Sequence, residues 1–102
     1  MTRQIFWSPH ASTDLYQQLE YIGRDSPQNA ALVRDRVMAA IARLTQLSIG
    51  RPGRVSGTYE IPIQKTSLIL AYQFVNADLI EILRLIHMAR DWQPGKWPKE
   101  TD

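Results

Sequence analysis

The spacing of apolar residues changes once along this chain, near residue 50, and that change decides the class of fold. Before it, apolar residues recur every three or four positions, which is typical of one face of a helix. After it they alternate or form short continuous runs, which is typical of strands. Because helices and strands occupy separate parts of the sequence, we expect an α+β fold.

Two helices are expected in the first half, and each begins with the dipeptide Ser-Pro. Ser8 and Ser26 are suitable N-caps, and the proline after each fits the first turn, where its missing N–H would be unpaired anyway. We expect Gly23 to end the first helix near Arg24, and Gly50 and Pro52 to stop the second. The short connection between them predicts an antiparallel helical hairpin.

Strands are expected at residues 3–7, before the helices, and in three segments after them. Residues 59–63 alternate, but Pro62 cannot donate to a strand ladder, so we expect this strand at an edge or at a bulge. Residues 68–75 and 79–88 follow, joined by an Asn-Ala-Asp turn. The predicted order is β-α-α-β-β-β, in which the last three strands form an antiparallel meander and the helices cover one face.

The last expected strand is apolar on both sides, unlike a strand of a sheet with one wet face. A single helical hairpin covers one face, so something else must cover much of the other. The C-terminal tail, with Trp92 and Trp97, is one candidate. A protein partner is the other, because large uncovered apolar patches mark interaction sites.

Composition narrows the classes of function. The 102 residues fit one domain spanning residues 1–102, with no apolar run long enough for a membrane span and no leader-peptide pattern. There is no cysteine, and the two histidines show no metal-ligand spacing. A net charge of +2 argues against extensive non-specific binding of nucleic acid but leaves room for a local basic patch. We therefore expect a soluble, cytoplasmic protein without a metal.

The segment 50–60, GRPGRVSGTYE, concentrates glycine, proline and arginine between the two halves of the chain. No helix follows its glycines, so it lacks the helix N-terminus that a phosphate-binding loop uses. The glycines instead predict turns into the next strand. Arg51 and Arg54 are expected beside the sheet, where arginine is well suited to contact carboxylates or phosphates.

With this order of elements, four segments make the chain resemble the ParE/RelE superfamily of toxins from type II toxin–antitoxin systems, and the ParE-like branch in particular. They are SPHASTDLYQQLEYI, GRPGRVSGTYEIPI, LILAYQFV, and IEILRLIHMARDW with the later WP pair. The resemblance spans nearly the whole chain and implies a cognate antitoxin as partner, with no metal and no cofactor. Tyr59 departs from the pattern, since ParE-like chains often carry arginine there.

The resemblance leaves three functions open. ParE-like members poison DNA gyrase, so the first expectation is a gyrase inhibitor that acts by binding and not as an enzyme. RelE-like members cut mRNA on the ribosome, so a metal-independent endoribonuclease is the first alternative. A non-toxic member that binds the antitoxin and represses the operon with it is the second.

The candidate site residues follow from these alternatives. For RNA cleavage, His87 is the titratable candidate. Arg84 lies three residues before it on a strand, so the two side chains should point to opposite faces, which counts against a compact catalytic cluster. We expect Arg84 to pair with a carboxylate such as Glu60 or Asp91, or with the antitoxin. The candidates for binding the target or the antitoxin are Arg51, Arg54, Tyr59, Arg84, Arg90 and Trp92.

Overall fold

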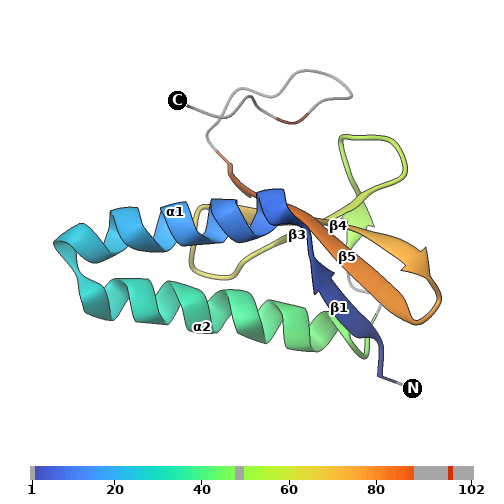
Figure 1. Cartoon of the computed structure of the whole chain (residues 1–102), viewed down its shortest axis with the longest axis horizontal. Coiled ribbons are helices and arrows are strands. Elements are labelled where there is room, and N and C mark those ends of the chain that lie inside the picture. The colour runs from blue at the N-terminus through green and yellow to red at the C-terminus, as the bar shows by residue number, and fades with distance from the viewer. Residues whose placement is uncertain (1, 48–49, 89–96, 98–102) are drawn as a thin grey trace.

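The computed structural model describes residues 2–47, 50–88 and 97. It contains two helices, α1 (Pro9–Asp25) and α2 (Pro27–Leu44), which lie side by side as an antiparallel hairpin (Figure 1). The five strands form one sheet in the order β1-β5-β4-β3-β2. They are β1 (Gln4–Trp7), β2 (Arg51–Pro52), β3 (Tyr59–Pro62), β4 (Leu68–Asn76) and β5 (Leu79–His87).

The α+β class and the predicted order of elements are confirmed, and the sheet is mixed. β3, β4 and β5 form the expected antiparallel meander. β1 runs parallel to β5, from the pair of Gln4 with Leu79 to the pair of Trp7 with Ile82. The short strand β2 was not expected from the sequence, and it pairs antiparallel with the start of β3.

Both helices begin where the Ser-Pro dipeptides predict. The Ser8 hydroxyl oxygen accepts a hydrogen bond from the Ala11 N–H, and that of Ser26 accepts one from the Asn29 N–H, each at 3.1 Å. These bonds satisfy two of the amide donors that a helix N-terminus otherwise leaves unpaired. Local capping therefore fixes both starting points, and with them the hairpin.

The predicted end of the first helix is close and that of the second is wrong. α1 ends at Asp25, one residue beyond the predicted Arg24, but it passes through Gly23, because one glycine costs a helix only about 1 kcal/mol whereas the residue before a proline is driven out of helical geometry. α2 ends at Leu44, well before Gly50, in a turn where the Thr45 hydroxyl donates to the Ala42 carbonyl at 2.6 Å. Pro52, expected as a helix stop, lies in β2.

The hydrophobic core lies between the helical hairpin and one face of the sheet. α2 contributes its buried stripe, and β3, β4 and β5 contribute alternate residues, as the two periods require. Neither helix in the described part of the chain has the length and hydropathy that a membrane crossing requires. The buried members of the core are Ala11, Val37, Ala40, Ile41, Leu44, Ile61, Ile63, Leu68, Leu70, Tyr72, Ile80, Ile82 and Leu85.

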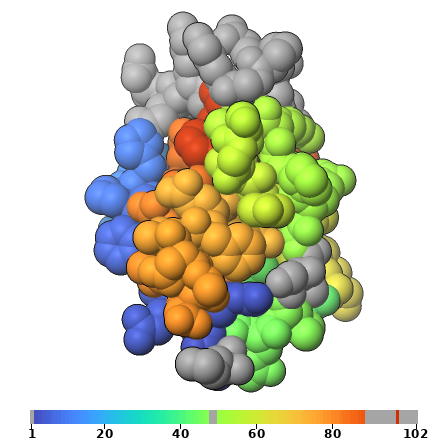
Figure 2. All heavy atoms as spheres, turned by 90° about the vertical axis from the view of Figure 1, so that its right-hand side faces the viewer, coloured from blue at the N-terminus to red at the C-terminus, as the bar shows by residue number. Residues whose placement is uncertain are grey.

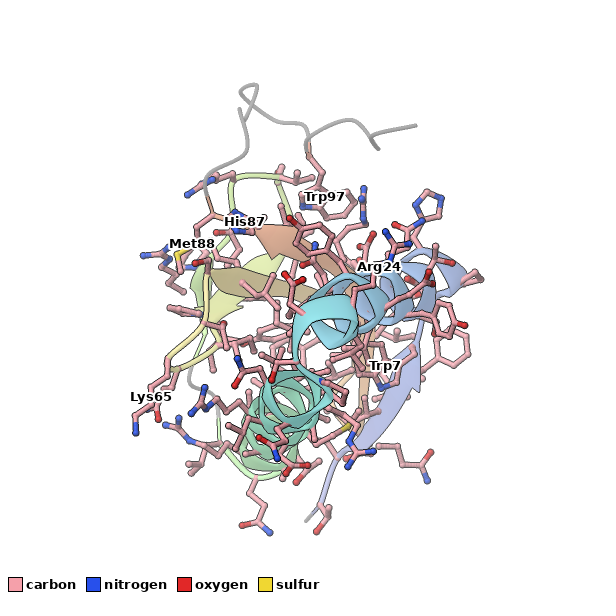
Figure 3. The ribbon with its side chains drawn as sticks, turned by 90° about the vertical axis from the view of Figure 1, so that its left-hand side faces the viewer. Trp7, Arg24, Lys65, His87, Met88 and Trp97 are labelled. Atoms are coloured by element: carbon pink, nitrogen blue, oxygen red, sulfur yellow. The ribbon has the colours of Figure 1, made fainter. Side chains whose placement is uncertain are left out.

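The second face of the sheet is covered in part by the chain itself. Ile69, Ala71 and Ile86 lie outside the helix-facing core and are nevertheless buried. Trp97, the one described residue of the tail, is half-buried and points from the tail toward the body of the protein (Figure 3). Trp92 lies outside the described residues. Whether a partner covers more of this face stays a prediction.

Candidate functional site

The segment between β2 and β3 is organised around the carboxylate of Glu60, whose side chain is 1% exposed. The backbone N–H of Arg54 donates to Glu60 Oε2 at 2.7 Å. Arg51 Nη2 and Arg54 Nε each lie 4.0 Å from Glu60 Oε1. A buried carboxylate must be hydrogen-bonded or paired, so Glu60 fixes both the course of this loop and the place of its two arginines.

Backbone bonds complete the loop. The Gly53 N–H donates to the Thr58 carbonyl at 2.8 Å, and the Thr58 hydroxyl donates to the Val55 carbonyl at 2.6 Å. Gly57 has a φ of 80°, in the left-handed region that favours glycine. The glycines of this segment therefore serve as turn residues leading into β3, as the sequence predicted.

Arg51 and Arg54 remain reachable from solvent, with side chains 61% and 41% exposed. They are brought together beside one buried carboxylate, and both guanidinium groups reach the surface. Guanidinium groups bind carboxylates and phosphates through two parallel hydrogen bonds. We define this pair, with Glu60 behind it, as the arginine site. In Figure 2 the loop that carries it forms part of the surface facing the viewer, in yellow-green.

Tyr59 belongs to a different surface. It precedes Glu60 in β3, so its side chain points to the opposite face of the sheet. There it stacks on Tyr72, with ring centroids 5.7 Å apart, and meets the edge of Phe74 at 5.5 Å. Tyr59 is 36% exposed. The structure therefore does not bring Tyr59 together with Arg51 and Arg54, although all three were predicted to bind a target or antitoxin.

The aromatic cluster is closed on its inner side. Tyr72 is buried, and burial raises the pKa of its hydroxyl above the usual value, although a backbone hydrogen bond with Gly50 acts in the opposite direction. A Cβ at Gly50 would collide with the Tyr72 ring, so the close approach requires glycine. The guanidinium of Arg3 lies 5.2 Å from the centre of the Phe74 ring. These contacts make the cluster chiefly a structural one, with Tyr59 at its exposed rim.

Arg84 forms a buried ion pair with Asp14 of α1. Its Nε donates to Asp14 Oδ2 at 2.8 Å and its Nη2 to Oδ1 at 3.3 Å, while the Leu85 N–H also donates to Oδ2, at 3.0 Å. The prediction that Arg84 pairs with Glu60 is wrong, because the Glu60 carboxylate lies beside Arg51 and Arg54 instead. Asp91, the other expected partner, lies outside the described residues. Contact of Arg84 with a target or antitoxin stays a prediction.

Asp14 is the functional or structural residue that sequence reasoning missed. It lies three residues after Ala11 and next to Leu15, on the apolar stripe of the first helix. An acidic residue on such a stripe must be paired when it is buried. The position of Asp14 on the apolar stripe was therefore the signal in the sequence for a buried ion pair.

Asp14 and Ser8 also continue the hydrogen bonding of the sheet where β1 stops. The pairing of β1 with β5 ends at Ile82. The Ser8 N–H then donates to the Ile82 carbonyl at 2.9 Å, and the Ser8 hydroxyl donates to the Leu83 carbonyl at 3.0 Å. Further along β5, Asp14 Oδ2 accepts a hydrogen bond from the Leu85 N–H. Side chains of α1 thus replace a missing strand at this edge.

His87 is the last residue of β5 and lies opposite Leu68 (Figure 3). The ladder is irregular at Leu83, four residues earlier, because Ala71 pairs with Arg84 and Tyr72 pairs with Ile82. This irregularity precedes Arg84, so it does not turn Arg84 and His87 toward the same face. In the described residues no group of three His, Cys, Asp or Glu side chains could hold a metal ion. Arg90 and Trp92 lie outside the described residues.

Comparison with known proteins agrees with the fold. The chain matches the model of the ParE toxin of type II toxin–antitoxin system, parDE, over residues 5–92. It is 32% identical over 91 residues to Y4kP, a candidate toxin of Sinorhizobium fredii, a match that covers 88% of this chain and 93% of the relative.

Two solved structures share its fold. A chain of the chromosomal ParDE system of Pseudomonas aeruginosa superimposes with a TM-score of 0.73 at 21% identity, covering 84% of this chain and 96% of that one. A chain of the RelBE2 toxin–antitoxin complex of Mycobacterium tuberculosis gives a TM-score of 0.57 at 21% identity, covering 85% and 99%. Since the family match extends over most of the sequence, the chain belongs to the ParE toxin family of type II toxin–antitoxin systems, within the ParE/RelE superfamily.

Proposed function

We propose that this ParE-family toxin acts by binding DNA gyrase and that a cognate antitoxin neutralises it. The observation that carries the proposal is the arginine site, in which a buried glutamate holds two exposed arginines in place. Such an arrangement is suited to contact an acidic surface on a protein.

The geometry around His87 supports binding over cleavage. Metal-free RNA cleavage needs a base, an acid and cations that converge on one phosphate. Arg84, the nearest predicted cation on the same strand, is committed to Asp14 inside the protein. A catalytic site built from His87 and Arg84 would have to break that pair first.

The antitoxin part of the proposal draws on relatives. The two structural neighbours come from the ParDE and RelBE2 toxin–antitoxin systems. An antitoxin segment with acidic side chains would suit Arg51 and Arg54. We further infer that residues 1–102 act as one toxin domain in the bacterial cytoplasm, and that stabilisation of a plasmid or of its own locus is the outcome.

The test is a supercoiling assay with purified gyrase and the purified toxin. The toxin should block supercoiling, the product of the neighbouring reading frame should restore it, and Arg54→Ala with Arg51→Ala should weaken inhibition. Arg24→Ala, which removes an exposed cation of α1 outside this site, is the matched control. If the toxin leaves the supercoiling activity of gyrase unchanged, the proposal is rejected. Rapid translation arrest with cut mRNA would then favour the endoribonuclease, and loss of all toxicity would favour the regulatory member.

A further inference from the structure

A shallow hollow of about 80 Å³ lies between α2 and the outer edge of β3. Its apolar surface comes from Ala39, Ala40 and Pro62, and two arginines stand at its sides. None of the described residues that line it is acidic. Its lining consists of Arg36, Ala39, Ala40, Arg43, Pro62 and Gln64.

The positive charges of this hollow form a row. Arg36 and Arg43 are seven residues apart on α2, so they share one face with a separation of about 10.5 Å along the axis. Arg36 Nη1 donates to the Lys65 carbonyl at 3.3 Å, which ties the loop between β3 and β4 to the helix. The Lys65 side chain extends outward from that loop (Figure 3). Two arginines therefore line one small apolar floor, and Lys65 lies on the adjoining loop.

The acidic groups near this surface are already engaged. Asp35, the acidic residue next to Arg36, lies 3.5 Å from Arg34. Glu60, two residues before Pro62 in β3, is buried in the arginine site. The net charge of +2 for the whole chain thus conceals a local excess of positive charge.

The edge of β3 at this hollow is poorly suited to an added peptide strand. In the described residues, pairing with β2 covers Tyr59 and Glu60 and stops short of Pro62. The Ile63 N–H donates inward to the Leu68 carbonyl at 2.9 Å, so the alternation of the ladder turns Pro62 outward. Proline has no N–H to donate, so a strand added here would lose a ladder bond. A polyanion does not need a backbone N–H from this edge in order to bind.

We propose that this surface, the α2–β3 groove lined by Arg36 and Arg43 around Ala39, Ala40 and Pro62, binds the phosphodiester backbone of a nucleic acid, with Lys65 on the adjoining loop. Binding is independent of base sequence, because phosphates carry no sequence information. The two arginines match phosphate oxygens through paired N–H groups, and the lysine adds a point charge. This groove is separate from the arginine site, so the inference does not depend on gyrase being the target.

The experiment measures fluorescence anisotropy of a labelled DNA duplex and a labelled RNA hairpin with the full chain over a range of salt concentrations. Each phosphate contact contributes about 0.9 to the slope of log K against log salt for duplex DNA. The double variant Arg36→Ala/Arg43→Ala should therefore lower that slope by about 2. Arg36→Lys/Arg43→Lys should keep most of the slope while weakening binding. The DNA and RNA arms show which nucleic acid is preferred.

Arg24→Ala is the matched control, because Arg24 is an exposed arginine on the other helix, α1, where it pairs with Glu20. It should leave binding nearly unchanged, and thermal melting should show that all variants fold. An unchanged salt slope in the double variant would overturn the proposal, as would an equal loss in Arg24→Ala. Failure of both nucleic acids to bind at low salt, with binding of poly-glutamate instead, would assign the groove to an acidic protein. A supercoiling result of either sign leaves these readouts unaffected.

Discussion

The buried ion pair between Asp14 and Arg84 predicts a large loss of stability when the acidic partner is removed. Asp14→Ala leaves the Arg84 guanidinium without its carboxylate in a place where that side chain is 11% exposed. The same substitution removes the acceptor of the Leu85 N–H, which lies at 3.0 Å from Asp14 Oδ2. This single substitution therefore leaves both a buried charge and an amide donor without a partner.

The size of the loss follows from these two effects. Removing one partner of a buried pair costs about 3–5 kcal/mol, because the other charge stays buried without compensation. Proteins of this kind have a free energy of unfolding of about 5–15 kcal/mol, so the variant should lose about a third to a half of a mid-range value of about 10 kcal/mol. The melting temperature should fall by roughly 4–8 °C for each kcal/mol lost.

The assay is equilibrium unfolding in urea followed by circular dichroism, with Glu20→Ala as the matched control. Glu20 pairs with Arg24 at 3.1 Å on the same helix, but both side chains are more than half exposed, so its removal should cost under about 1 kcal/mol. Asp14→Asn, which keeps two of the contacts without the charge, should fall between them. An apolar double replacement, Asp14→Leu/Arg84→Met, should recover much of the loss. If Asp14→Ala unfolds at the same urea concentration as Glu20→Ala, the reasoning about burial is wrong.

Three further predictions concern the segment from Gly50 to Glu60 and the aromatic cluster. Glu60→Ala should lower the free energy of unfolding by about 1–3 kcal/mol, because the Arg54 N–H loses its 2.7 Å acceptor, and urea unfolding measures this loss. Gly57→Ala should cost about 1–2 kcal/mol, since a φ of 80° disfavours any residue with a Cβ, and an unchanged urea midpoint would contradict it. The raised pKa of Tyr72 means that the unfolded chain loses this proton first, so the contribution of Tyr72 to stability should be fully present below a pH of about 10 and should fall as the pH rises beyond it. In Tyr72→Phe that alkaline fall should be smaller, which urea unfolding at several pH values would show.

The predictable parts of the fold depend on contacts between near neighbours. The Ser8 and Ser26 caps act over three residues, so the sequence shows both helix starts directly. β2 is two residues long and ends in Pro52, so no period could reveal it. Its existence depends on pairing with β3.

The candidate site, like the fold, was predictable only where it depends on residues that are close in the sequence. Arg51 and Arg54 were expected beside the sheet, and the structure places them there, but the carboxylate that holds them had been assigned to Arg84. The true partner of Arg84 is separated from it by 70 positions in the sequence. Nothing in the local pattern links two such residues, although an aspartate on an apolar helix stripe indicates that a distant cation exists.

The closure of β5 by β1 and α1 also has a consequence for how the toxin is made. Ser8 bonds to Leu83 across 75 positions, so β1 and the start of α1 lack their final partner until β5 has been made. At about 5–20 residues per second, the 70 positions between Asp14 and Arg84 correspond to roughly 4–14 s of synthesis. During that interval the sheet edge between β1 and β5 cannot close. An antitoxin already present in the cell therefore has several seconds to meet an unfinished toxin before a finished one exists.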